Sequence, residues 1–232
     1  MHDADLDKLI VALDVSTARD ARVLIDQLGD SVTFYKIGLE LLFSGGLDLA
    51  RALKADRKRV FLDLKFLDIG NTVERAVANA AELGVDFLTL HGHDTKTLKA
   101  AIRGRGTTPT KLLSVTVLTS LDAHDLDEQG ISLKPADLVV KRALLAHAAG
   151  LDGVIASGQE ASAVRGATSP TFLIVTPGIR MRGSDAGDQT RITTPRDAIA
   201  AGANHIVVGR PITAAGDPKA AANAIQANIA GH

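Results

Sequence analysis

Two patterns of apolar and polar positions alternate along this chain. Short runs of Val, Ile, Leu and Phe recur, and stretches rich in Ala and Leu, with polar residues at helical spacing, separate them. The runs that predict β-strands are residues 9–15, 33–37, 60–65, 87–91, 112–118, 153–156, 171–176 and 205–208. The clearest helices are expected at residues 17–28, 71–83, 135–149 and 218–230, with shorter ones at 94–103 and 195–201. This order is typical of repeated βα units.

The number of these units favours a closed barrel. Eight strands alternating with helices in 232 residues predict an α/β protein with a (β/α)8 TIM barrel, rather than an open doubly wound sheet. No Pro/Ser-rich linker or charge block breaks the alternation, so residues 1–232 are expected to form a single domain. The longest stretch without periodicity, residues 177–194, contains Gly178, Gly183 and Gly187 and is predicted to act as a lid over a site.

Composition narrows the class of ligand. With 26 basic and 27 acidic residues the net charge is -1, so we expect neither nucleic acid nor an anionic membrane as a partner. An anionic ligand must therefore be held by local groups. The chain has no cysteine, which excludes disulfides and thiolate chemistry and fits a reducing cytoplasm. Residues 1–7 lack the order of a signal peptide, and no apolar run reaches the roughly 18 residues of a membrane span, so a cytoplasmic location is expected.

Charged residues interrupt the first three predicted strands. Strands of a parallel barrel are buried on both faces, so Asp14, Lys36, Asp63 and Lys65 require an explanation. Asp63 and Lys65 are two positions apart and are expected to share one face of their strand. If that face is the barrel interior near its C-terminal mouth, the four side chains form one charge network where catalytic groups of this fold lie. The alternative is a set of structural ion pairs, which desolvation makes poor stabilisers.

A second group of residues fits an anion. Barrels of this kind commonly hold a phosphate with the loops after strands 7 and 8 and the start of a short extra helix. Arg180 and the segment 187–189 follow predicted strand 7, while Gly209 and Arg210 follow predicted strand 8. Glycine permits close backbone approach and arginine offers a planar fork that matches a phosphate. The alternative is a glycine-containing turn with solvated arginines.

Two further classes of site find little support. His91 and His93 form the only close histidine pair, and no nearby spacing supplies a third ligand, so no metal site is expected. The sequence has neither a Gly-rich phosphate-binding loop nor a dinucleotide fingerprint after the first strand. Nicotinamide and ATP chemistry are therefore not predicted.

The segment 63–72 closely resembles the signature of the orotidine 5'-phosphate decarboxylase family. Its pattern Asp-x-Lys-x-x-Asp-Ile-x-x-Thr is highly specific. The resemblance extends in order over segments 12–14, 35–38, 118–120, 177–180, 187–189 and 208–212. It therefore covers nearly the whole chain and implies decarboxylation of orotidine 5'-phosphate to uridine 5'-phosphate and CO2, without a cofactor.

The resemblance also implies roles for individual residues. Asp14 is expected to hold the ribose, Lys36 to bridge the ribose and the charge network, Asp63 to lie against the substrate carboxylate, and Lys65 to donate the proton. Asp68 and Thr72 are expected to reach into the other active site of a homodimer. It further implies that Thr119, with Ser120 beside it, contacts the pyrimidine and that the phosphate is bound by Arg180, Gln189, Gly209 and Arg210. Ile69 and Pro177 are also expected to contact the substrate.

The chemistry of the reaction agrees with these roles. Loss of CO2 from C6 leaves a carbanion in the ring plane with no cofactor to delocalise it, so a fixed ammonium must stabilise and protonate it. Lys65 between Asp63 and Asp68 is expected to stay protonated because opposite charges favour its charged form. The share of ground-state repulsion from Asp63 is left open.

Two competing functions predict different behaviour. Related barrels that act on sugar phosphates, such as keto-gulonate phosphate decarboxylase and hexulose phosphate synthase, use a divalent metal and a similar strand-3 motif. Activity in the presence of a chelator would therefore distinguish the cofactor-free decarboxylase from them. A catalytically silent barrel that binds a nucleotide would show no turnover. Lys36, the continuation 68–72 and Gln189 favour the decarboxylase over the metal-dependent barrels. The complete charge network argues against a silent barrel, because a binding protein gains nothing from two carboxylates near an anionic ligand.

Overall fold

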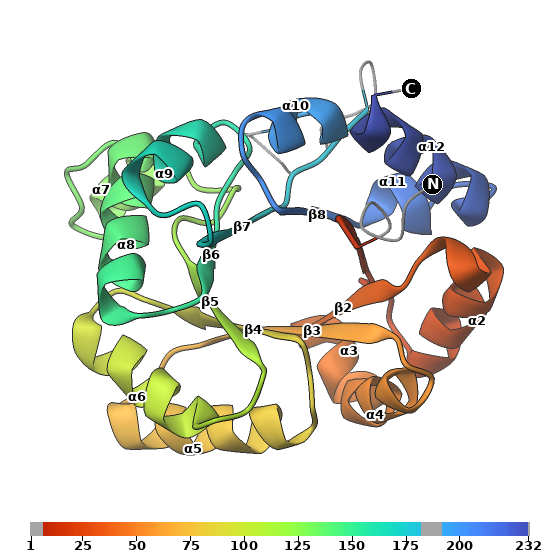
Figure 1. The fold of residues 1–232 in the computed structure, drawn as a ribbon, viewed down its shortest axis with the longest axis horizontal. Helices are drawn as coiled ribbons and strands as arrows, with labels where there is room; N and C mark the ends of the chain where they lie inside the picture. The colour runs from red at the N-terminus through yellow and green to blue at the C-terminus, as the bar shows by residue number, and fades with distance from the viewer. Residues whose placement is uncertain (1–6, 182–191, 232) are drawn as a thin grey trace.

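The computed structural model describes residues 7–181 and 192–231, and within these ranges eight parallel strands close into a barrel (Figure 1). The strands are β1 (Leu9–Ala12), β2 (Phe34–Gly38), β3 (Arg59–Phe66), β4 (Phe87–His91), β5 (Lys111–Val115), β6 (Gly153–Ile155), β7 (Leu173–Thr176) and β8 (His205–Val208). Each pairs with its neighbour in the sequence, and β1 closes the barrel against β8. The predicted fold class is confirmed.

Helices form a ring around the barrel (Figure 1). Those that the sequence predicts are α2 (Ala18–Leu28), α5 (Gly70–Glu82), α6 (Thr95–Arg105), α8 (Pro135–Ala149), α10 (Pro195–Ala200) and α12 (Pro218–Ala230). The others are η1 (Gly29–Ser31), α3 (Leu39–Leu41), η2 (Leu42–Gly46), α4 (Leu47–Ala55), α7 (Ala123–Glu128), α9 (Ala161–Ala167) and α11 (Arg210–Thr213). Periodicity did not reveal the run from α3 to α4, because it bends at Ser44 and Gly45, and Gly45 adopts a φ of 91°.

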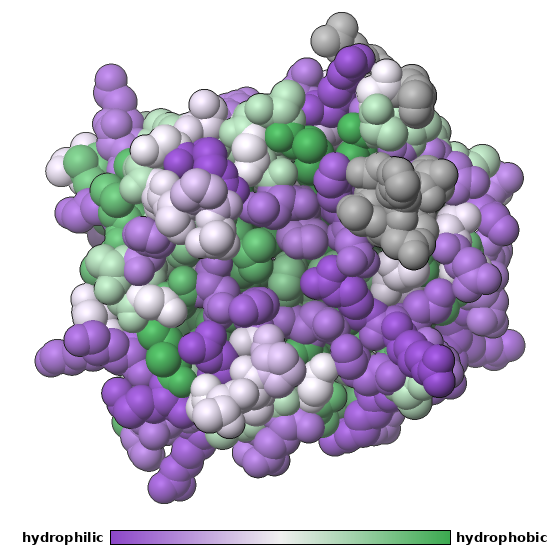
Figure 2. Space-filling model, in the orientation of Figure 1, coloured by the Kyte–Doolittle hydropathy of each residue, from purple (hydrophilic) through white to green (hydrophobic). Residues whose placement is uncertain are grey.

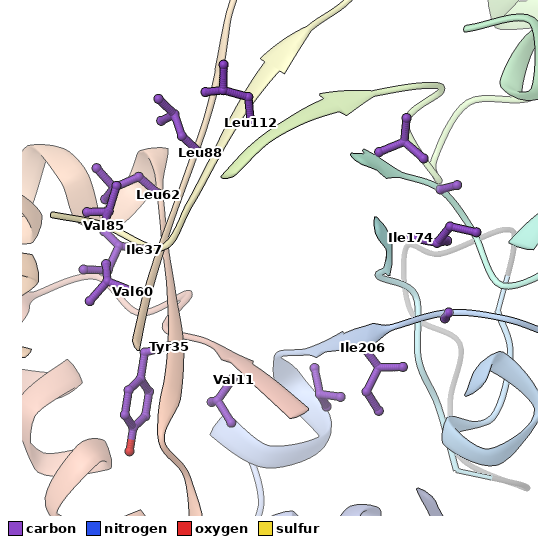
Figure 3. Packing of buried hydrophobic residues seen from close by; sticks show 14 of the residues in the cluster. Val11, Tyr35, Ile37, Val60, Leu62, Val85, Leu88, Leu112, Ile174 and Ile206 are labelled. Carbon is purple, nitrogen blue, oxygen red and sulfur yellow. The ribbon is translucent and has the colours of Figure 1, made fainter. Parts of the chain in front are cut away.

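Strand alternation divides the barrel into two layers of core. The smaller cluster faces the barrel interior and contains Ile10, Ala12, Phe34, Phe61, Phe87, Leu113, Val175 and Val207. Residues at the intervening positions, such as Val11, Tyr35 and Leu62, belong to the larger cluster under the helices (Figure 3). Because alternate positions share a face, charged residues in phase with the interior cluster lie above it on the same side.

Two predicted strands end three residues earlier than the sequence indicated. Strand β1 ends at Ala12 and β5 ends at Val115, so Asp14 lies in the loop after β1 rather than on the strand. The amide of Leu13 still donates to the carbonyl of Lys36 at 2.9 Å, but pairing stops there and the chain turns toward Thr17, which caps α2. The apolar residues from which these strands were predicted therefore continue past the last hydrogen-bonded pair of the sheet.

The N-terminal end of the barrel is closed by aromatic and charged groups. The guanidinium of Arg59 lies 4.1 Å from the centre of the Phe34 ring, and the His205 ring packs edge-on against Phe34 and Phe87. The Nδ1–H of His205 donates to the Asp7 carbonyl at 2.8 Å. These contacts seal the end of the barrel opposite the candidate site.

The outer surface is mixed in character. The face in Figure 2 is largely hydrophilic, with hydrophobic residues in small scattered patches. Among the described residues, no helix is long and apolar enough to span a bilayer.

Candidate active site

A cavity of about 620 Å³ opens where the strands end at their C-terminal edge. The site residues predicted from the sequence that line it are Asp14, Lys36, Asp63, Lys65, Thr119, Pro177, Arg180, Gly209 and Arg210. Interior residues such as Ala12 and Phe61 also line it. Segments from the first, second, third, fifth, seventh and eighth strands therefore meet at one pocket, as the C-terminal edge of a closed parallel barrel requires.

Three ion pairs link the charged side chains at the floor of the pocket. The Lys36 Nζ lies 3.0 Å from Asp14 Oδ1 and 3.5 Å from Asp63 Oδ2. The Lys65 Nζ lies 2.8 Å from the same Asp63 Oδ2. Positive and negative groups thus alternate in the order Asp14, Lys36, Asp63, Lys65.

Burial and charge act in opposite directions in this network. Burial lowers the pKa of Lys36, but the carboxylates of Asp63 and Asp14 outweigh it, and the pKa lies above its ordinary value. Burial likewise opposes ionisation of Asp63, but the ammonium groups of Lys36 and Lys65 hold the pKa of this carboxyl below its ordinary range. Both groups are therefore charged at neutral pH, and Lys36 is only 8% exposed.

Thr89 is a member of the site that sequence reasoning missed. It lies on β4 and is fully buried, and its hydroxyl donates a hydrogen bond to Asp63 Oδ1 at 2.9 Å. The Thr89 hydroxyl oxygen in turn accepts a hydrogen bond from the Lys65 amide at 3.1 Å. Its signal in the sequence was a hydroxyl in an otherwise apolar run, in phase with the interior residue Phe87.

The predicted phosphate-binding residues come from the loops after β7 and β8, and β8 is the strand paired with β1. Arg180 is 9% exposed, and its amide donates to the Thr193 carbonyl at 2.9 Å, which joins the two ends of the loop. Gly209 precedes α11, and Arg210 is exposed at the first position of that short helix. Gln189 lies outside the described residues, as do Gly183 and Gly187, so the predicted lid is described only at its ends.

The predicted cross-subunit residues do not line the cavity of their own chain. Asp68 and Thr72 are exposed, and Ile69 is 72% exposed. The Asp68 carboxylate accepts from the Ile69 amide at 2.6 Å. Within residues 7–181 and 192–231, Lys65 pairs with Asp63 and has no ion pair or hydrogen bond to Asp68. In a single chain, therefore, Lys65 does not lie between the two carboxylates as the sequence suggested.

Thr119 and Ser120 differ in their position relative to the cavity. Thr119 lines the cavity, whereas Ser120 is exposed and is not among its lining residues. Of the two candidates for a contact with the base, the geometry thus favours Thr119.

The two histidines at the end of β4 lie side by side. Their rings are 5.1 Å apart, and burial, His93 and the Lys65 ammonium lower the pKa of His91 to about 4. In the described part of the chain, no group of three His, Asp or Glu side chains is arranged to hold a metal ion.

Comparison with known proteins gives consistent results. Residues 7–225 match the model of a family described as "Orotidine 5'-phosphate decarboxylase / HUMPS family". The chain is 55% identical over 225 residues to orotidine 5'-phosphate decarboxylase of Rhodopseudomonas palustris strain BisA53, covering 97% of this chain and 95% of that protein. It is 53% identical over 223 residues to the enzyme of that name from Methylorubrum populi, covering 96% and 95%.

A solved structure extends the similarity to three dimensions. The crystal structure of orotidine 5'-phosphate decarboxylase from Lactobacillus acidophilus superimposes with a TM-score of 0.83 at 38% identity. The match covers 95% of this chain and 98% of that one.

Proposed function

The chain belongs to the orotidine 5'-phosphate decarboxylase / HUMPS family, and from this and the site geometry we propose that it converts orotidine 5'-phosphate to uridine 5'-phosphate and CO2. This reaction forms the pyrimidine nucleotide in de novo biosynthesis. The observation that carries the proposal is the network of Asp14, Lys36, Asp63 and Lys65 at the floor of the cavity.

The charge network supplies what the chemical step requires. Breaking the bond between C6 and the carboxylate leaves an electron pair on C6 in the plane of the pyrimidine, where the ring π-system cannot delocalise it. The Lys65 ammonium stabilises this charge and then transfers a proton to C6. Asp63 holds the ammonium in place at 2.8 Å, so that little reorganisation is needed as the charge develops. No cofactor is required in this scheme.

The ribose and base occupy the space beside the network. Asp14 and Lys36 reach the cavity from the ends of β1 and β2, and we assign them to the ribose hydroxyls. Asp14 is half-exposed and accepts hydrogen bonds, while Lys36 donates them and also contacts Asp63. Thr119 lies on the wall after β5 and is assigned to the pyrimidine edge. Lys36 therefore links substrate placement to the carboxylate that positions Lys65.

The phosphate is assigned to the loops after β7 and β8. Arg180 and Arg210 carry the positive charge, Gly209 allows close approach of the backbone, and Pro177 lines the wall. Gln189 belongs to this group by its place in the sequence. Binding energy from the phosphate, far from C6, pays for closing the loop and excluding water from the charged pocket.

A homodimer completes the site in this proposal. Asp68 and Thr72 follow β3, are exposed and do not line the cavity of their own chain, which leaves them available to a second subunit. Leu67 and Ile69, which flank Asp68, are 55% and 72% exposed, and burial of such side chains in an interface is favourable. We assign Asp68, Ile69 and Thr72 to the active site of the partner subunit.

The test is a direct assay with a chelator present. The ultraviolet absorbance of orotidine 5'-phosphate is followed after addition of purified protein in EDTA, beside the Lys65→Ala variant. Rapid conversion to uridine 5'-phosphate by the wild type alone is the expected result. A folded wild type that converts nothing in EDTA, but acts on a sugar phosphate once a divalent metal is added, would overturn the proposal in favour of the metal-dependent relatives.

A further inference from the structure

The ladder between β3 and β4 changes register at the charged segment. Phe61 pairs with Phe87 and Leu62 with Leu88, but the next pair is Phe66 with Leu90. Three residues of β3, from Asp63 to Lys65, therefore lie opposite Thr89 alone, which makes this segment a β-bulge. The regular ladder is absent where the site has its densest charge.

Lys65 has an unusual backbone within this bulge. Its φ is 50°, in the left-handed region that a residue with a Cβ seldom adopts because the conformation is strained. A conformation of this kind persists where surrounding contacts hold it. The contact made by the Lys65 amide is its hydrogen bond to the Thr89 hydroxyl oxygen at 3.1 Å.

The direction of each hydrogen bond at Thr89 is set by its partners. The ionised Asp63 carboxylate can only accept, so the hydroxyl proton goes to Asp63 Oδ1 at 2.9 Å. The Lys65 amide can only donate, and it uses a lone pair of the same oxygen. One fully buried hydroxyl therefore joins the carboxylate side chain at one end of the bulge to the backbone at its other end.

We propose that Thr89 is a positioning residue of this active site, whose hydroxyl fixes the Asp63 carboxylate and the left-handed Lys65 backbone so that the Lys65 ammonium meets C6. The inference rests on the proposed function. Thr89 is not among the cavity-lining residues and acts through Asp63 and Lys65. The ammonium reaches Asp63 Oδ2 while the hydroxyl holds Oδ1, so both oxygens of one carboxylate are used to orient the proton donor.

The predicted effect is on turnover rather than on substrate affinity. A misplacement of about 1 Å in a reacting group can cost about 100-fold in rate. Groups assigned to the ribose and phosphate come from other strands, so KM depends little on Thr89. Loss of the Thr89 hydrogen bond also raises the pKa of Asp63 toward its ordinary value, which moves the acidic limb of the kcat profile to higher pH.

Three variants distinguish the effect of the Thr89 hydroxyl on activity from the effects of packing and of overall stability. Thr89→Val keeps the shape and removes the hydroxyl, and Thr89→Ser keeps the hydroxyl and removes a methyl group. Thr110→Val is the matched control, because Thr110, like Thr89, is a buried threonine with a hydrogen-bonded hydroxyl. Its hydroxyl donates to the backbone carbonyl of Val85 at 2.8 Å, at the end of the barrel opposite the site. Values of kcat and KM for orotidine 5'-phosphate are measured for each from pH 4.5 to 9.

The expected result is a kcat for Thr89→Val that is lower by about 10- to 100-fold, with KM within about threefold of wild type. Thr89→Ser should recover kcat to within about fivefold, and Thr110→Val should keep the wild-type kcat. Equal kcat for Thr89→Val and wild type would overturn the inference. So would an equal loss in Thr89→Ser, which would indicate packing, or in Thr110→Val, which would indicate lost stability.

Crystal structures of the variants make the inference independent of the assay. In Thr89→Val the Lys65 backbone should leave the left-handed region, and the distance from its Nζ to Asp63 should exceed 4 Å. An unchanged geometry would overturn the role of Thr89 even if the wild type is active. A wild type without turnover would instead remove the proposed function, while these structures still decide whether the hydroxyl holds Asp63 and Lys65.

Discussion

The Lys65 ammonium lies 2.8 Å from the Asp63 carboxylate across a β-bulge in which Lys65 itself has a left-handed backbone. Simple alternation would also place these side chains on one face, but the register shift shows that the pairing is made by a distorted strand. The network that results joins the ends of β1, β2 and β3 and defines the floor of the cavity.

Replacing Lys65 by alanine removes the proposed proton donor. Turnover of orotidine 5'-phosphate should fall by roughly 1,000-fold or more, because the same ammonium stabilises the carbanion and protonates it. Affinity for uridine 5'-phosphate, measured by calorimetry, should change by less than about tenfold. Lys99→Ala, at an exposed position of α6, is the control and should retain full activity. Activity of Lys65→Ala within about tenfold of wild type would contradict the assignment.

A methyl group at Gly38 would press on the ion pair between Lys36 and Asp14. A Cβ at this position would lie 3.2 Å from Lys36 Nζ and 3.5 Å from Asp14 Oδ1, and the φ of -99° is open to alanine. Gly38→Ala should lower kcat/KM by about 10-fold with little change in Tm, because the methyl displaces charged groups without straining the backbone. Gly166→Ala is the control, since its Cβ would meet nothing within 4 Å. Equal kcat/KM for both variants would count against the network.

Arg210 should contribute to both affinity and turnover through the phosphate. Arg210→Ala is expected to raise KM and lower kcat, each by about 10-fold or more, because remote binding energy supports closure of the site. Orotidine, which lacks the phosphate, is the matched substrate, and its slow decarboxylation should be the same in the variant and the wild type. Unchanged kinetics with the nucleotide would remove Arg210 from the phosphate site.

The cross-subunit assignment of Asp68 is tested by mixing two inactive variants. Lys65→Ala and Asp68→Ala are each expected to be nearly inactive, but a dimer of one chain of each contains one site with both native groups. After subunit exchange, an equal mixture should regain about a quarter of wild-type activity. If Asp68 acted within its own chain, the mixture would stay inactive. Two samples of the same variant mixed together provide the control.

His205 should make the fold less stable in mild acid. Burial lowers its pKa from 6.5 to about 4, so between these values the unfolded chain binds a proton that the folded chain does not. Stability is therefore fully present above pH 6.5 and is lost as the pH falls toward 4, by about 1 to 2 kcal/mol between pH 7 and pH 5.

Urea unfolding at pH 7 and pH 5 measures this loss. His205→Asn should show a smaller loss than wild type, and part of the slope should remain because the pKa of His91 is also lowered to about 4. His124→Asn, exposed on α7, should behave as the wild type does. The same slope in wild type and His205→Asn would contradict the prediction.

Much of this architecture follows from local pattern. The period of two along a strand places Asp14, Lys36 and Asp63 in phase with the interior residues Ala12, Phe34 and Phe61. The C-terminal ends of parallel strands share one edge, so a count of eight βα units was enough to predict that these charges meet at a mouth. Both inferences depend on geometry within a single strand or unit, which neighbouring residues dictate.

Other features required the folded molecule. The bulge at Asp63 to Lys65, the hydroxyl of Thr89 that spans it, and the outward placement of Asp68 depend on how β3 pairs with β4 and on where that pairing stops. Register and strand ends are set by contacts between residues some 25 positions apart, as with Thr89 and its partners at separations of 26 and 24. The periodicity of a short segment carries no information about such distant contacts, so the register and the strand ends are decided only when the chain packs.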